Sequence, residues 1–168
     1  MKRSLPQRNE RPDLAAVSRR ELNEDTLRNA VDLAMHWFQA HDAVDSGRLS
    51  TLLHPDVVIR SLFSDRPVQG RSAAITHFQR TMAEYPDLKL RIVAGPVAAQ
   101  GASALRVMAD IVFEGHRRSP ANERDRALSV PGVVVLGVNS AAVTEVRTYF
   151  DKNEWLTQIG LPGEATPV

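Results

Sequence analysis

The chain has 168 residues, 43% hydrophobic and 24% charged, which is the balance of one ordinary globular domain. Its formal net charge of +1 gives no reason to expect nucleic acid or an acidic membrane as a partner. The absence of cysteine excludes disulfides, thiolate metal sites and cysteine nucleophiles. No apolar stretch approaches the ~20 residues that span a bilayer, and the basic N-terminus lacks the apolar core of a signal peptide. We therefore expect a cytoplasmic protein.

The first half of the chain predicts mostly helices. Residues 1–23 are polar without sustained periodicity, and we expect a disordered or partly helical arm there. An amphipathic helix is predicted over residues 25–42, with Asp25 as its N-cap. Two shorter helices are predicted over residues 47–53 and 71–84, each ended by a nearby proline.

Strands are predicted where β-branched and apolar residues run between groups of turn residues. They cover residues 57–63, 68–69, 88–99, 103–115, 128–139 and 143–151. The charged, proline-containing loop at residues 116–127 is placed to cover a pocket mouth. A last helix is predicted over residues 153–159, and residues 163–168 are expected to be a flexible tail.

Helices first and long strands afterwards predict a single α+β domain over residues 24–162, with the helices on one face of the sheet. Long strands joined by short turns indicate a strongly bent, mostly antiparallel sheet wrapped around the first helix. Such a domain is cone-shaped. Its wide end is too broad for side chains to fill, so we expect a pocket for a small molecule.

Several segments, in this order, resemble the NTF2-like superfamily. They read LLHPDVV at 52–58, GRSAAI at 70–75, YPDL at 85–88, and VTEVRTYFD at 143–151 followed by WLTQIGL at 155–161. The last two runs resemble its SnoaL-like branch, and the match covers about residues 26–162. That branch includes polyketide cyclases that close rings by aldol chemistry, and its relatives include limonene-type epoxide hydrolases and ketosteroid isomerases. The resemblance implies a cone-shaped NTF2-like fold and a homodimer that pairs through the open sheet face.

The resemblance also implies that Asp110 and Asp151 point into the pocket as a catalytic pair. Burial raises the pKa of a carboxyl group, and two close carboxyls split further, so that one acts as acid and the other as base. Strand alternation alone gives a different answer for Asp110, because it places the apolar residues of that strand toward the core. Those residues are Leu105, Val107, Ala109, Ile111 and Phe113. The alternative for Asp151 is the N-cap of the last helix.

Ten residues are candidates for substrate binding. Tyr149 and Arg147 share a strand face with Asp151. Met108 stands where limonene-type hydrolases carry an arginine, and Ile59 and Ser61 stand where those enzymes hold the attacking water with tyrosine and asparagine. The remaining candidates are Trp37, Phe63, Trp155, His41 and His116. Because a hydrolytic water is poorly held by such residues, ring closure or isomerisation is favoured over hydrolysis.

The sequence has no HxH or HExxH spacing and no GxSxG, P-loop or dinucleotide motif, so we expect neither a metal nor a cofactor. The predicted function is cofactor-free acid/base catalysis on a hydrophobic small molecule in a biosynthetic pathway. A SnoaL-like cyclase or isomerase is the first interpretation, with epoxide opening as one route to ring closure. Two alternatives stay open, a limonene-type epoxide hydrolase and a non-catalytic module for ligand binding or dimerisation.

Overall fold

The computed structural model describes residues 24–101, 104–119 and 125–162, so the predicted N-terminal arm and C-terminal tail lie outside the described residues. Within these ranges the chain forms four helices and six strands. The helices are α1 (Glu24–Asp42), α2 (Ser46–Leu52), α3 (Arg71–Glu84) and α4 (Lys152–Gln158). The strands are β1 (Leu53–Arg60), β2 (Val68–Gln69), β3 (Lys89–Gln100), β4 (Leu105–Arg117), β5 (Arg126–Val138) and β6 (Val143–Phe150).

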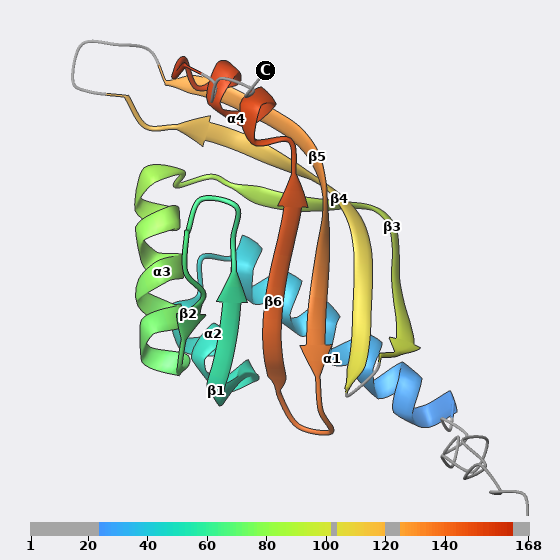
Figure 1. Cartoon of the computed structure of the whole chain (residues 1–168). Coiled ribbons are helices and arrows are strands. Elements are labelled where there is room, and N and C mark those ends of the chain that lie inside the picture. Colours follow the sequence, from blue (N-terminus) through green and yellow to red (C-terminus); the bar gives the residue numbers. More distant parts are fainter. Residues whose placement is uncertain (1–23, 102–103, 120–124, 163–168) are drawn as a thin grey trace, which may run out of the picture.

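The six strands form one bent, open sheet in the order β2-β1-β6-β5-β4-β3. All neighbours are antiparallel except β1 and β6, which are parallel. Figure 1 shows α1 crossing behind the sheet, α3 standing beside β2, and α4 lying against the bent ends of β4 and β5. The predicted α+β class with a bent sheet around the first helix is confirmed. No helix within the described ranges is long and apolar enough to cross a membrane.

The largest error in the predicted elements concerns the first strand. It was expected over residues 57–63, but β1 begins at Leu53, which pairs with Val143 of β6. It ends at Arg60 because the backbone turns there, with the Ser64 N–H donating to the Ser61 carbonyl at 3.1 Å. The loop predicted over residues 116–127 is also shorter, since β4 and β5 take up its two ends, and residues 120–124 lie outside the described residues.

The core lies between the inner face of the sheet and the helices. On β4 the alternation is strict: Val107, Ala109, Ile111 and Phe113 are buried, whereas Met108 and Asp110 are exposed. On the helical side, α1 contributes Trp37, which is 1% exposed. Burying a side chain of this kind stabilises the fold by about 2–3 kcal/mol. The inner face of the sheet is thus set by the period of two that apolar residues follow along each strand.

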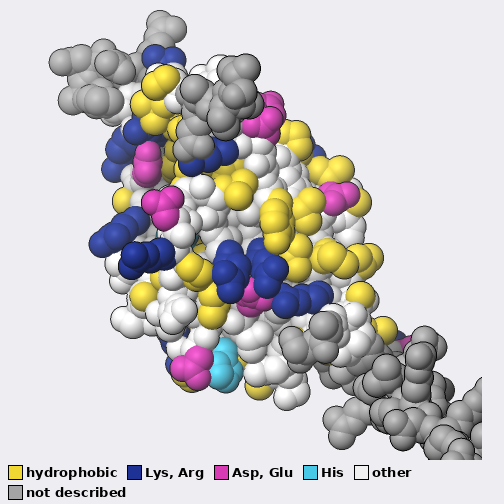
Figure 2. Space-filling view, in the orientation of Figure 1, with side chains coloured by type: hydrophobic (Ala, Val, Ile, Leu, Met, Phe, Trp, Pro, Cys, Tyr) yellow, Lys and Arg dark blue, Asp and Glu magenta, His cyan; other side chains and the backbone are white. Residues whose placement is uncertain are grey.

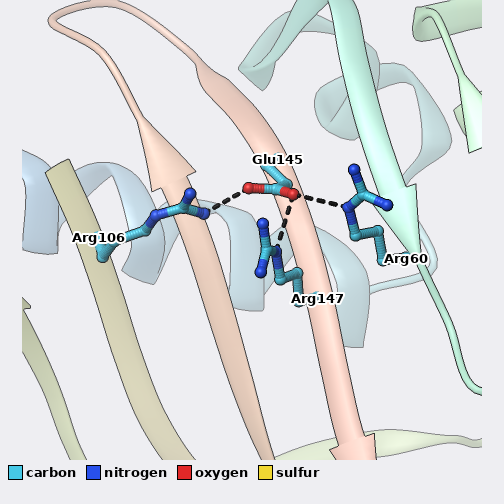
Figure 3. A network of polar contacts seen from close by, with 4 residues as sticks. All are labelled: Arg60, Arg106, Glu145 and Arg147. Carbon is cyan, nitrogen blue, oxygen red and sulfur yellow. Dashed lines mark hydrogen bonds and ion pairs between the residues drawn. The ribbon is translucent and has the colours of Figure 1, made fainter. Parts of the chain in front are cut away.

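The outer face of the sheet carries a charged cluster centred on Glu145 of β6. Its carboxylate accepts hydrogen bonds from Arg60 Nε (3.0 Å) on β1 and Arg147 Nε (2.8 Å) on β6. A further bond comes from Arg106 on β4 (Figure 3). In Figure 2 the dark blue side chains surround a magenta carboxylate in the middle of this face, beside a broad yellow apolar area. One carboxylate therefore ties together three strands.

Arg106 reaches Glu145 across an intervening strand because of Gly137 on β5. Gly137 pairs with Arg106 on one side and with Glu145 on the other. A Cβ atom at Gly137 would lie 3.1 Å from Glu145 Cβ and 3.3 Å from the Arg106 guanidinium. Such contacts are closer than side chains normally make, so a larger residue would block the path of Arg106.

Three arginines change the acidity of Glu145. Burial raises its pKa, but hydrogen bonds from Arg147, Arg106 and Arg60 outweigh that effect and lower the pKa from the usual 4.5 to about 2. A carboxyl with a lowered pKa in the folded state contributes stability above its unfolded pKa. That contribution is lost as the pH falls from about 4.5 to about 2.

We predict that Glu145→Gln lowers the free energy of unfolding by about 2 kcal/mol, because three neighbouring guanidinium groups lose their shared counter-charge. Urea denaturation at pH 7 measures the loss. The variant should also lack the part of the acid destabilisation that wild type shows below pH 4.5. Glu114→Gln is the control, since it removes an exposed pair with Arg91 at the sheet edge. An equal loss in both variants would contradict the special role of Glu145.

Helix α4 begins where Asp151 caps it. The Asp151 carboxylate accepts hydrogen bonds from the backbone N–H groups of Asn153 (2.9 Å) and Glu154 (3.0 Å). These donors have no partner inside the helix, so an acceptor at the N-cap position stabilises the first turn. The N-cap interpretation of Asp151 is thus confirmed.

Asp151→Ala should lower the free energy of unfolding by about 1 kcal/mol, because the two N–H groups lose their acceptor. Asp151→Asn should keep most of the stability, since an amide oxygen also caps a helix. Thermal denaturation of both variants checks this order. If both variants unfold like wild type, the cap contributes nothing. If Asp151→Asn keeps its stability but abolishes turnover of a substrate, Asp151 has the predicted catalytic role.

Candidate functional site

A cavity of about 350 Å³ lies between the inner face of the sheet and helices α1, α3 and α4. Its sheet wall consists of inward residues of β1, β3, β4 and β6: Ile59, Leu90, Phe113, Val146, Thr148 and Phe150. The helices and the turns next to them supply most of the other lining residues. Its walls are mainly apolar, which is the usual character of a site for a small organic molecule.

Aromatic rings form two opposite groups around this cavity. On the α1 side, Trp37 stacks near His41 and Phe78, with ring centroids 5.5 and 6.1 Å apart. On the α4 side, Trp155 contacts Phe63 at 5.5 Å and Phe113 at 5.2 Å. Each group packs edge-on or tilted, which is favourable for aromatic pairs. The cavity is therefore bounded by fixed, flat surfaces.

Six of the predicted binding residues lie where the sequence analysis expected them, in the cavity wall. They are Trp37, His41, Ile59, Ser61, Phe63 and Trp155. Phe63 lies in the turn after β1 and is half exposed, which places it at the cavity edge. Their contact with a substrate stays a prediction, because only their position is observed.

The expected inward orientation of Asp110 and Asp151 is wrong. Asp110 is exposed on the outer face of β4, and Asp151 is exposed at the start of α4; neither lines the cavity. The reason is the alternation along β4, where Ala109 and Ile111 occupy the inner face and force Asp110 outward. A catalytic role for these two carboxylates therefore finds no support in their placement.

Four further candidates also lie outside the cavity wall. Tyr149 and Arg147 share the outer face of β6, and Arg147 binds Glu145. Met108 is exposed on the outer face of β4. His116 Nδ1 is hydrogen-bonded to Asp87 Oδ2 at 2.7 Å. For Tyr149, Arg147 and Met108 the neighbouring residues on the strand, not the candidates, face inward.

His41 is the buried ionisable group in the helical wall of the cavity. Its side chain is 6% exposed, and Nδ1 has no hydrogen-bond partner among the described residues. Nδ1 lies 3.6 Å from Asp42 Oδ1, a contact that is electrostatic and too long for a hydrogen bond. Since Nδ1 faces Asp42, Nε2 is the ring nitrogen that a bound molecule can meet.

Asp42 is held in place by the sheet. Its carboxylate accepts a hydrogen bond from the Leu90 N–H at 2.9 Å, and its backbone carbonyl accepts one from Lys89 Nζ at 2.6 Å. Burial raises the pKa of Asp42, but His41, the Leu90 N–H and Lys89 together lower it below the usual value. Asp42 is therefore ionised at neutral pH and presents negative charge to His41.

Tyr85 supplies a hydroxyl group to the opposite side of the cavity. Its oxygen accepts a hydrogen bond from Trp155 Nε1 at 3.0 Å, and an indole N–H can only donate. The Tyr85 proton is thus available to an acceptor in the cavity. Burial raises the pKa of Tyr85; the Trp155 bond opposes this and nearby Glu84 adds to it. The hydroxyl consequently stays protonated at neutral pH.

The sequence analysis missed the contribution of α3 and the turn after it. His77, Thr81, Glu84 and Tyr85 line the cavity, and their spacing puts them on the helix face next to Phe78. Burial and, secondarily, Arg80 lower the pKa of His77, so its ring is neutral at pH 7. The helical period was visible in the sequence and could have identified this face. Within the described ranges, no three His, Asp or Glu side chains gather as a metal-binding group.

The comparisons with known structures identify the fold. A hypothetical protein of Catenulispora acidiphila with a ketosteroid isomerase-like fold, solved with trimethylamine, matches with a TM-score of 0.64 and 22% identity over 81% of this chain and 98% of its own. A proposed polyketide cyclase of Xanthomonas campestris matches with a TM-score of 0.68 and 22% identity, over 79% of this chain and 98% of its own. A proposed SnoaL-like polyketide cyclase of Jannaschia matches with a TM-score of 0.65 and 18% identity, over 81% of this chain and 94% of its own.

At these identities the structural matches establish a shared fold. A search of curated proteins finds no match. The sequence itself matches the model of one protein family over residues 32–159, from the middle of α1 to the end of α4. This range contains the cavity and most of the residues that line it. The chain belongs to the family of SnoaL-like polyketide cyclases.

Proposed function

We propose that this chain is a cofactor-free acid/base enzyme, a cyclase or isomerase that acts on a hydrophobic carbonyl compound. The observation that carries the proposal is the His41–Asp42 pair in an apolar cavity that also holds the Tyr85 hydroxyl. Membership of the SnoaL-like family supports the same class of reaction. An apolar wall excludes water, which strengthens the effect of the few polar groups inside.

The reaction begins with proton removal from the carbon next to a carbonyl group. His41 Nε2 takes this proton, and the Asp42 carboxylate stabilises the positive charge that forms on the ring. Tyr85 donates its hydroxyl proton as a hydrogen bond to the carbonyl oxygen, where negative charge develops. The enolate then attacks a second carbonyl of the same molecule, which closes a ring, and the alkoxide that forms takes back the proton held by His41. Return of the proton to another carbon of the enolate gives isomerisation instead.

A buried polar atom next to the cavity favours a ligand with hydrogen-bonding groups. Trp37 Nε1 is buried without a partner among the described residues. An unpaired buried donor costs about 1–3 kcal/mol, so such atoms persist mainly where function or a bound molecule uses them. This observation favours an enzyme over a module that only dimerises.

Hydrolysis of an epoxide is less well supported by the cavity wall. Ile59 has no polar side-chain atom with which to hold a water molecule. Ser61 Oγ accepts a long hydrogen bond of 3.3 Å from the Phe63 N–H. An intramolecular reaction needs no positioned water, so ring closure and isomerisation fit this wall better.

Exchange of α-protons for deuterium tests the first step, because both reactions share it. With 2-tetralone in D₂O, followed by proton NMR, wild type should accelerate exchange above the buffer rate. His41→Gln should lower the enzymatic rate on the order of 100-fold, since it removes the base. Tyr85→Phe should lower it about 10–100-fold, since the enolate loses one hydrogen bond.

His36→Gln is the matched control, because His36 lies on the same helix but is exposed. It should exchange like wild type. All variants are compared by circular dichroism so that a folding defect is not read as a catalytic one. If 2-tetralone, 1-tetralone and 1,3-cyclohexanedione all exchange at the buffer rate with wild type, or if His36→Gln is as slow as His41→Gln, the proposal is wrong.

We also propose that two copies pair through the outer face of the sheet. The support is a patch of exposed apolar side chains there, formed by Val93, Val97, Met108 and Tyr149. Exposed apolar patches of this kind commonly mark interfaces. The Glu145 cluster beside this patch has net positive charge, because three arginines pair with one carboxylate. Asp110 on the same face is negative.

Light scattering should give twice the mass of one chain at micromolar concentration. Met108→Lys should shift the mass toward a single chain, because it introduces an unpaired charge into the apolar patch. Val44→Lys is the control, since Val44 is somewhat more exposed than Met108 but lies in the turn between α1 and α2. A wild-type mass of one chain contradicts the dimer.

A further inference from the structure

A second hollow adjoins the cavity where α3, β4 and α4 end. It has a volume of about 540 Å³ and shares Glu84, Ile159 and Leu161 with the cavity wall. Because the two spaces have these three residues in common, one elongated molecule can occupy both. We call this second space the basic hollow.

The basic hollow is lined by three arginines, Arg117, Arg118 and Arg126, against the single carboxylate Glu84. Arg117 Nε donates to Glu84 Oε1 at 2.8 Å, so this pair is neutral overall. Arg118 and Arg126 form no ion pair with the described residues, so the described part of the hollow carries an excess of two positive charges.

The other charges near the hollow, among the described residues, do not reverse its sign. Asp125 accepts a hydrogen bond from the Ser119 N–H at 2.9 Å but does not line the hollow. Asp87 is paired with His116. Arg80 of α3 lines the cavity itself and adds a further positive charge to its wall.

Backbone contacts help to place Arg118 and Arg126. The Arg118 N–H donates to the Glu84 carbonyl at 2.9 Å, which fixes the end of β4 to the end of α3. The Arg126 guanidinium lies against Gly160, where an added Cβ would stand 2.6 Å from Arg126 Cζ. Gly160 has a φ of 75° and follows α4, so only a glycine allows both this turn and this close contact.

We propose that the substrate carries an anionic group, a carboxylate or a phosphate, on an apolar body. The body occupies the cavity, and the anion binds Arg118 and Arg126 in the basic hollow. Guanidinium groups suit this role because they bind carboxylate and phosphate through two parallel hydrogen bonds. The inference rests on the proposed function, since it names the substrate class of that same site.

Binding of three probes that share one alkyl chain tests the inference: decan-1-ol, decanoate and decyl phosphate, each below its micellar concentration. Trp37 and Trp155 are the two tryptophans of the chain and both line the cavity, so their fluorescence reports on occupancy. Wild type should bind decanoate or decyl phosphate about tenfold more tightly than decan-1-ol at low salt. The tighter of the two anions identifies the group, and added salt should weaken only the anions.

The double variant Arg118→Gln/Arg126→Gln should bind all three probes as weakly as wild type binds decan-1-ol. Arg28→Gln is the control, because it removes one positive charge at the far end of α1 and should keep the preference. Equal binding of the alcohol and both anions by wild type, or an equal loss in Arg28→Gln, overturns the inference. In that case decan-1-ol still binds, and the proposed acid/base function stands or falls by α-proton exchange alone.

Discussion

The period of two along β4 and β6 decides which chemistry the cavity can have. Inward positions on these strands are taken by Val107, Ala109 and Ile111 and by Val146, which pack against the helices and are at most 3% exposed. A carboxylate at any of these positions would lose its hydration without a partner, which costs several kcal/mol. Acidic residues of the two strands therefore point outward. The ionisable groups of the cavity come from α1, α3 and the turn after α3.

The same alternation places the charged network and the cavity-lining residues on opposite faces of a single strand. β6 presents Glu145 and Arg147 to the outer face and Val146 and Thr148 to the inner face. The outer network joins β1, β6 and β4, and Gly137 lets it reach across β5. Because the strands that it joins also form the cavity wall, the position of the wall depends on charges that no ligand in the cavity touches.

Much of the fold could be predicted from the sequence, because local patterns suffice for it. The α3 range and β2 match their predicted bounds, and the runs at residues 143–151 and 155–161 indicated the SnoaL-like branch that the family match shows. The site was harder to predict for a physical reason. Periodicity shows which residues share a face, and it correctly placed Ile111 and Phe113 on the inner face. The resemblance instead placed Asp110 on that inner face, which is wrong. Contacts such as Arg106 with Glu145 depend on strand register, which no local pattern in this sequence specifies.

The position of His41, the proposed base, is set by the end of α1. Trp37 and Phe78 pack against its ring. Two features place negative charge near the ring. His41 lies in the last turn of α1, where the helix dipole favours a cation, and Asp42 presents its negative charge 3.6 Å away. Leu90 of β3 holds Asp42 in that place. The contact between α1 and β3 thus fixes the counter-charge of the proposed base before any ligand binds.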